Sequence, residues 1–309
     1  MNLPTTPKSP ADQALSMESL SPSPPSTKAN EGIPTQAPKT RPPYSLIVGL
    51  TLLGLITLMM LVSLVWTPHD AYLTSSDYSK QLQGPSAQHW FGTDHLGRDV
   101  LSRSMIAAQT VFLVGASTLI ISGSIGITLG LIAGYRGGWA DIVIMRLIEV
   151  FATIPGTILL LLFITIFGRG TQQTIIAISL MSFTTFTRMV RSRVLSLRQH
   201  EHILWAQVIG ARNLRIIFVH IMPDLLPLIL IIAANQFSSA VMAEAGLSYL
   251  GLGVQVSEPS WGNMLTRAQA GLLTNPWNAI IPGLLITILV IGSNLTADGL
   301  SRHYNLKVR

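Results

Sequence analysis

The stretch that decides the fold is residues 201–223, EHILWAQVIGARNLRIIFVHIMP. The surrounding segment 196–216 is too polar to cross lipid, yet strongly apolar segments lie on both sides of it. Arginines gather around this segment while Glu201 is the only carboxylate there: the arginines are Arg188, Arg191, Arg193, Arg198, Arg212 and Arg215. Because basic loops stay on the cytoplasmic side of a membrane, the pattern predicts a cytoplasmic loop between two spans.

The composition agrees with a polytopic membrane protein. The chain has 309 residues, of which 49% are hydrophobic and only 11% are charged, whereas soluble domains carry about 25% charged residues. The net charge of +6 does not indicate nucleic-acid binding, because the basic residues gather at the ends of apolar segments. Since the chain contains no cysteine, disulfides and thiolate metal sites are excluded.

We expect an all-α fold with six transmembrane helices, because six segments are long enough to span about 30 Å of hydrocarbon. The predicted spans are 44–66, 110–135, 141–167, 174–190, 216–242 and 277–295. The second span contains regularly spaced glycines, which allow helices to approach closely in lipid. Pro155 is expected to kink the third span.

Charge also predicts the topology and the domain organisation. Residues 1–43 are rich in Pro, Ser, Thr and Lys and are expected to form a disordered cytoplasmic tail. The transmembrane domain covers 44–305, and a short tail of 306–309 follows. Counting spans from the basic loop places both termini in the cytoplasm. The predicted loops are 67–105 and 243–276 outside and 191–216 inside.

The cytoplasmic loop has its own expected structure. It is predicted to form two short helices separated at Gly210, with Asn213 as the cap of the second helix.

The segment 201–223 resembles the EAA loop of ABC importer permeases, which docks on the ATPase subunit. The matching residues are Glu201, Ala206, Gly210, Ala211, Ile216, His220 and Pro223. Leu204 and Trp205 depart from the family, which usually has Glu and Ala there, and this implies a more apolar contact. The resemblance implies an ATPase-coupling set of Glu201, Leu204, Trp205, Ala206, Gly210, Ala211 and Arg212. The alternative is a solvated basic loop that lies flat on anionic lipid.

Four further blocks narrow the family: 87–103, 244–254, 259–265 and 294–300. They resemble the C-type permease subunit of dipeptide, oligopeptide and nickel importers. The resemblance implies a type I ABC importer permease fold in the bacterial inner membrane. It also implies a heterodimeric pore with a second permease subunit, separate ATPase subunits and an external solute-binding protein.

Two further groups of residues are candidates for function. In the predicted external loops, the docking candidates for the binding protein are Trp90, Asp94, Arg98 and Trp261, although a packed scaffold explains them equally well. Arg98 is expected to pair internally with Asp94 or Asp99.

Ionisable residues within spans mark candidates for the translocation path or gate. These candidates are Arg146, Glu149, Pro155 and Glu244. Arg146 and Glu149 stand three residues apart and can neutralise each other as a structural pair. Glu244 could meet a cationic substrate or pair with a neighbouring subunit.

No enzymatic motif is present in the sequence. There is no phosphate-binding Gly-x-x-x-x-Gly-Lys loop and no nucleophile elbow, so no catalytic residue is assigned. We expect no cofactor in this chain, with ATP and Mg on the partner ATPases. His69, His89 and His95 share one external loop, but scattered loop histidines usually bind nothing, and no metal site is assigned.

The sequence therefore predicts a permease subunit that forms half of the pore of an ATP-driven importer for peptides. Import of nickel or of a metal–metallophore complex by the same architecture is the alternative. A self-sufficient secondary transporter and a membrane scaffold without transport activity are rival classes.

Overall fold

The computed structural model describes residues 44–304 except 73, 75–76 and 256. The predicted tails, 1–43 and 306–309, lie outside the described residues. Within the described part the all-α prediction is confirmed: it contains no strand, and its one β-bridge is isolated, between Thr93 and Asp99.

The chain is built from ten α-helices and three short helical turns in its described part. The helices are α2 (Tyr44–Ser63), α3 (Val100–Arg136), α4 (Gly138–Thr153), α5 (Gly156–Phe167), α6 (Thr171–Leu197), α7 (Glu201–Val208), α8 (Asn213–Arg215), α9 (Met222–Tyr249), α10 (Trp261–Ala268) and α11 (Trp277–His303). The turns are η1 (Tyr78–Lys80), the π-helical η2 (Ile216–Ile221) and η3 (Gln269–Gly271).

Four described helical stretches are long and apolar enough to cross a membrane, namely α2, α3, the continuous stretch 213–249 and α11. The pair α4–α5 supplies a fifth if it is taken as one span. Helix α6 has 27 residues but is not among them, and its first turn carries Gln172 and Gln173. Because α6 packs inside the bundle, it does not need an apolar surface on every side. The prediction of six spans is compatible with this arrangement.

The predicted glycine-mediated packing is confirmed between α3 and α6, which share the most extensive helix contact in the described part. A Cβ atom added at Gly130 would lie 2.8 Å from Val190 Cβ, and one added at Gly134 would lie 2.8 Å from Val194 Cβ. The two backbones can approach this closely only because these positions carry no side chain.

The third predicted span is broken and not merely kinked. Helices α4 and α5 form an angle of 86° with each other, and Ile154 and Pro155 lie in the bend. Pro155 has no N–H to donate, and it disfavours helical geometry at Ile154, which has an extended ψ of 124°. The sequence prediction of one kinked helix was wrong in this respect.

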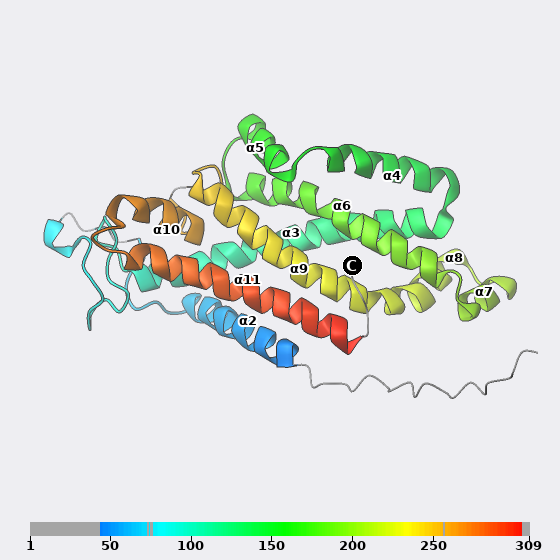
Figure 1. The fold of residues 1–309 in the computed structure, drawn as a ribbon, viewed down its shortest axis with the longest axis horizontal. Helices are drawn as coiled ribbons and strands as arrows, with labels where there is room; N and C mark the ends of the chain where they lie inside the picture. Colours follow the sequence, from blue (N-terminus) through cyan, green and yellow to red (C-terminus); the bar gives the residue numbers. More distant parts are fainter. Residues whose placement is uncertain (1–43, 73, 75–76, 256, 305–309) are drawn as a thin grey trace, which may run out of the picture. The chain divides into compact units, whose positions relative to one another are not determined.

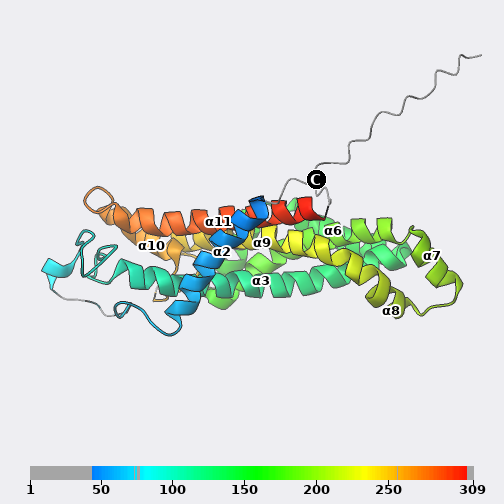
Figure 2. The same cartoon turned by 90° about the horizontal axis from the view of Figure 1, so that it is seen from below.

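The helices place two sets of loops at opposite ends of the bundle (Figures 1 and 2). The described residues of 67–99 lie at one end together with α10, and we call this the loop end. Helices α7 and α8 lie at the other end, which we call the α7 end. Helix α2 runs beside α11, and α4 with α5 flanks α6 at the periphery of the bundle.

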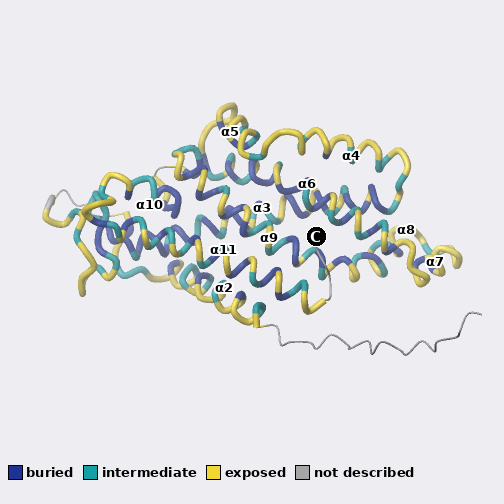
Figure 3. The backbone as a smooth tube through the Cα atoms, in the orientation of Figure 1, coloured by how far each residue is buried: buried dark blue, intermediate teal, exposed yellow. Residues whose placement is uncertain are grey.

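Burial is concentrated in α3, α6, α9 and α10, whereas α4, α5 and α7 are largely exposed (Figure 3). Helix α4 buries only Ile148, and many of its other apolar side chains face outward. In a membrane-embedded helix such a surface meets lipid or another subunit.

Candidate functional site

Helix α7 is a short helix with well-defined ends. Glu201 begins it, and a carboxylate in the first turn interacts favourably with the positive end of the helix dipole. The helix ends in a Schellman motif: Gly210 N–H donates to the Gln207 carbonyl, and Ala211 N–H donates to the Ala206 carbonyl, both over 3.0 Å. Gly210 adopts a φ of +76°, which glycine reaches without strain. The predicted break at Gly210 is thus confirmed.

One face of α7 is fixed to the bundle. Ile203 and Ala206 are buried on this face. They join an apolar cluster contributed by α3, α6, η2 and α9, whose buried members include Leu131, Val190, Val194, Leu197, Ile216, Ile221 and Leu225. Because these side chains are closely packed, α7 is connected to the ends of α6 and α9.

The opposite face of α7 is apolar and exposed. Trp205 is 65% exposed and Ile209 is 82% exposed, and Leu204 and Val208 are also exposed. We call these four residues the α7 patch. Single exposed apolar residues are ordinary, but a cluster of them on one short helix is typical of an interaction surface.

The turn after α7 differs from the prediction in one residue. Arg212 is the residue that caps α8, and Asn213 is the first residue within it, so the prediction of Asn213 as the cap was wrong. The Asn213 side chain is engaged elsewhere, because its Oδ1 accepts a hydrogen bond from Tyr135 Oη of α3 over 3.1 Å. Helix α8 then continues through η2 into α9 and does not form a separate unit.

A polar groove borders the α7 patch. It is lined by Tyr135, Arg136, Arg198, Gln199, Leu204, Gln207 and Asn213. The α7 end thus combines an apolar contact surface with a basic rim.

Helix α4 is tied to α6 near this end by a bidentate ion pair. Arg191 Nη2 lies 2.6 Å from Asp141 Oδ2, and Arg191 Nε contacts Asp141 Oδ1 as well. Two parallel hydrogen bonds fix direction as well as distance, so α4 is oriented relative to α6.

The candidates for the translocation path do not form one site. Arg146 and Glu149 pair over 2.9 Å on the exposed surface of α4. Pro155 lies in the bend after α4, whereas Glu244 lies near the end of α9. Their role in translocation stays a prediction.

Glu244 is fully buried where α9 meets α10. Its Oε1 accepts a hydrogen bond from Ser248 Oγ over 2.7 Å. Trp261, at the start of α10, is also fully buried, and its Nε1 donates to the Ser104 carbonyl over 3.0 Å. In this structure both side chains anchor α10 and the preceding turn, and the predicted docking role of Trp261 stays a prediction.

The other docking candidates lie at the loop end. Trp90 is exposed there, and the predicted internal ion pair of Arg98 forms with Asp94, with Nη2 and Oδ2 2.6 Å apart. Burial alone would raise the pKa of Asp94, but the hydrogen bonds and the charge of Arg98 outweigh it, so the pKa lies below its usual value. Asp99 instead caps α3 by accepting a hydrogen bond from Ser102 N–H.

The structure also shows a polar groove that the sequence analysis did not single out. It lies between α3, the start of α6 and the turn before α10, and its polar lining includes Gln109, Thr110, Arg169, Gln172, Gln173 and Glu258. The sequence signal was available, because Arg169, Gln172 and Gln173 form a polar connection between the predicted spans 141–167 and 174–190.

The coupling candidates, in contrast, all come together at the α7 end. Residues 126–309 match the family described as "Binding-protein-dependent transport system inner membrane component".

Curated relatives match over most of their length. The dipeptide transport system permease protein DppC of Alkalihalophilus pseudofirmus is 40% identical, covering 82% of this chain and 83% of that protein. The glutathione transport system permease protein GsiD of Pectobacterium atrosepticum is 36% identical, covering 80% and 83%. The nickel transport system permease protein NikC of Escherichia coli K12 is 36% identical, covering 84% and 93%. The chain therefore belongs to the family of binding-protein-dependent transport system inner membrane components, the ABC importer permeases of the dipeptide, oligopeptide and nickel group.

Proposed function

We propose that this chain is one of two permease subunits of an ATP-driven importer and forms half of its translocation pore. As a member of its family it is a multi-pass inner membrane transport component and not an enzyme. The observation that carries the proposal is the α7 patch, an exposed apolar surface on a helix whose other face is locked into the bundle.

The proposed orientation places the α7 end in the cytoplasm. The arginines around α7 favour that side of the membrane, and both chain termini then lie on the same side. The loop end faces outward, where an external solute-binding protein would deliver its cargo to the exposed surface around Trp90. The Asp94–Arg98 pair is largely buried and would support that surface from within.

In the proposed mechanism, separate ATPase subunits bind the α7 patch and supply ATP and Mg. When these subunits close, they displace α7. The packed contacts of Ile203 and Ala206 pass that displacement to α6 and α9. Helix α4 follows α6 through the Asp141–Arg191 pair, and the bundle moves between outward-open and inward-open arrangements.

We propose peptides as the cargo. The names of two relatives, a dipeptide permease and a glutathione permease, support this assignment. The nickel permease of E. coli supports the alternative, import of nickel or a metal–metallophore complex. In either case the external binding protein supplies most of the specificity.

Gly210 provides the test of coupling. A Cβ added at Gly210 would meet no atom within 4 Å, so a substitution acts through its φ of +76° and not through a clash. In the reconstituted transporter we expect Gly210→Val to reduce ATP-dependent cargo uptake at least tenfold while ATP hydrolysis continues. Gly210→Asn is the matched control and should retain most of the uptake, because Asn tolerates this conformation.

Uptake by Gly210→Val at the wild-type rate would contradict the coupling role. Uptake into liposomes by the purified chain alone, driven by an ion gradient, would instead favour a secondary transporter. Undiminished cargo uptake by cells without this chain would favour a scaffold.

A further inference from the structure

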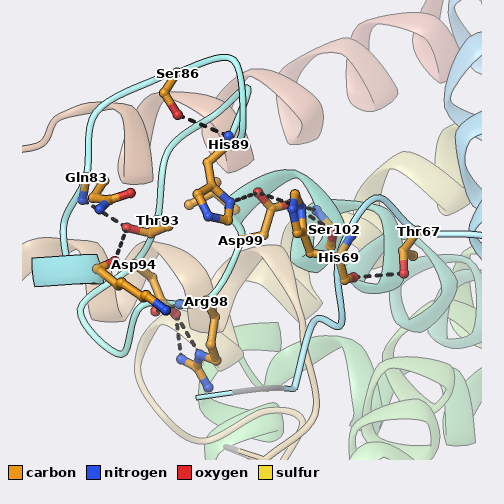
Figure 4. Close-up of polar contacts among 12 residues, drawn as sticks. Thr67, His69, Gln83, Ser86, His89, Thr93, Asp94, Arg98, Asp99 and Ser102 are labelled. Atoms are coloured by element: carbon orange, nitrogen blue, oxygen red, sulfur yellow. Dashed lines mark hydrogen bonds and ion pairs between the residues drawn. The ribbon is translucent and has the colours of Figure 1, made fainter. Parts of the chain in front are cut away.

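We propose that the loop end holds a binding site for a divalent transition-metal ion, formed by His69, His89 and Asp99. The three residues come from separate segments: His69 follows α2, His89 lies in the loop before α3, and Asp99 caps α3. Each offers one ligand atom, and these atoms all lie within 4.8 Å of one another (Figure 4). The proposal is independent of the transported cargo.

The Asp99 carboxylate is oriented for this role. Its Oδ2 accepts hydrogen bonds from Ser102 N–H over 2.8 Å and from Ser102 Oγ over 2.7 Å. Its Oδ1 faces the two imidazoles: it is hydrogen-bonded to His89 Nδ1 over 2.8 Å, a contact that a bound ion would replace, and it lies 3.7 Å from His69 Nδ1. One oxygen is thus fixed by the protein, and the other is directed at the nitrogen ligands.

The charge of Asp99 also favours a cation. The side chain is only 2% exposed, and no lysine or arginine forms an ion pair with it among the residues that the structure describes. The start of α3 and Ser102 stabilise the carboxylate in part. A bound metal ion would supply the positive charge that a buried carboxylate ordinarily finds in a partner.

The second layer of contacts holds the ligands in place. Ser102 Oγ accepts a hydrogen bond from the backbone N–H of His69 over 3.0 Å, so one serine orients two of the three ligands. His89 is held by Ser86, whose Oγ accepts from the His89 backbone N–H over 3.1 Å. Such outer contacts are typical of metal sites, where they set the direction of the ligating groups.

The geometry needs only a small adjustment to accept an ion. Tetrahedral zinc with ligands at 2.0–2.2 Å places its ligand atoms about 3.4 Å apart. His69 Nδ1 would move slightly toward Asp99 Oδ1 and His89 Nδ1 slightly away from it, and both rings have room to turn because the His69 side chain is 43% exposed and that of His89 is 21% exposed. The exposed side of the cluster also leaves space for water to complete the coordination. Two imidazole nitrogens and one carboxylate oxygen suit zinc, nickel, cobalt or copper rather than magnesium or calcium.

The test uses the full transporter, purified through a tag without histidine, stripped with a chelator and dialysed against buffered Zn²⁺. We expect His69→Ala and His89→Ala each to lower the affinity of one zinc-binding site per transporter at least tenfold. His95→Ala is the matched control from the same loop and should leave that affinity unchanged, and Mg²⁺ in excess should not compete. The α7 end carries His200 and His202 near His220, so all variants are made in a His200→Ala, His202→Ala background to remove adventitious binding there.

A second measurement does not depend on loss of binding. With Cu²⁺ as the probe, the electron paramagnetic resonance spectrum should show coupling to two imidazole nitrogens in the parent and to one in His69→Ala. Ser102→Ala retains all three ligands but removes the hydroxyl that orients Asp99 and His69, so it should lower the zinc affinity about tenfold. Zinc affinity that is the same in the parent, His69→Ala and His89→Ala would overturn the proposal, and so would a parent copper spectrum without coupling to two nitrogens.

Discussion

Asp94 orders a short loop at the loop end through its two carboxylate oxygens. Oδ1 accepts hydrogen bonds from the backbone N–H groups of Leu96 and Arg98, and Oδ2 accepts from Arg98 Nε over 2.8 Å. Because the pKa of Asp94 is lowered in the folded protein, this network contributes stability above the usual pKa of about 3.8. The contribution is lost as the pH falls through the lowered value.

The replacement Asp94→Asn should therefore destabilise the loop end at pH 7. Removing one partner of a buried pair costs about 3 kcal/mol, because Arg98 is left without its carboxylate. We expect thermal unfolding of the purified transporter to show a lower midpoint for the variant from pH 8 down to pH 5. The difference from wild type should shrink only in more acidic buffer. Asp70→Asn, at an exposed position in the same loop, should have little effect, and a pH-independent difference would contradict the argument.

Contacts between residues close in the sequence could be predicted, whereas contacts between distant segments could not. The break at Gly210 and the ion pair of Arg98 followed from the sequence, because both depend on neighbours in the chain. The meeting of His69 with His89 and Asp99 did not, since it depends on how the segment after α2 folds back onto α3. Asn213 was misassigned as a cap for the same reason: its partner, Tyr135, is on a distant helix.

At the level of elements, the packing of α3 on α6 depends on the spacing of glycines. Gly126, Gly130 and Gly134 each face α6 at distances that leave no room for a methyl group. This could be predicted from the sequence because small residues at every fourth position form one helix face. The position of the bend between α4 and α5 could be predicted from Pro155. Its angle of 86° could not, because α5 also packs against α6, which is distant from Pro155 in the sequence.

Gly130→Val should separate α3 from α6. The added side chain would overlap Val190, and overpacking of this kind typically costs about 1–3 kcal/mol. We expect a lower thermal midpoint and reduced recovery of the assembled transporter from membranes. Gly283→Ala in α11 is the control, because a Cβ there meets nothing within 4 Å. Equal stability of the Gly130→Val variant and the wild type would show that the two helices are not held at this distance.

For the whole molecule, the proposed topology can be tested with single cysteines, since the natural chain contains none. Trp90, in the loop before α3, belongs to the loop end and Trp205, in α7, belongs to the α7 end, and both side chains are exposed. In right-side-out vesicles a membrane-impermeant maleimide should label Trp90→Cys and not Trp205→Cys. In inverted vesicles stripped of ATPase subunits the pattern should reverse. Labelling of Trp205→Cys from the outside would invert the proposed orientation.

The length of two helical stretches has a mechanical consequence. Helix α3 and the stretch 213–249 each contain 37 residues. At 1.5 Å per residue each is about 55 Å long, so about 25 Å extends beyond a hydrocarbon layer of about 30 Å. Such an overhang acts as a lever arm. Where the whole overhang lies on one side and pivots at the membrane surface, a tilt of about 10° moves its far tip by about 4 Å, and a displacement of that tip rotates the membrane-spanning part of the helix.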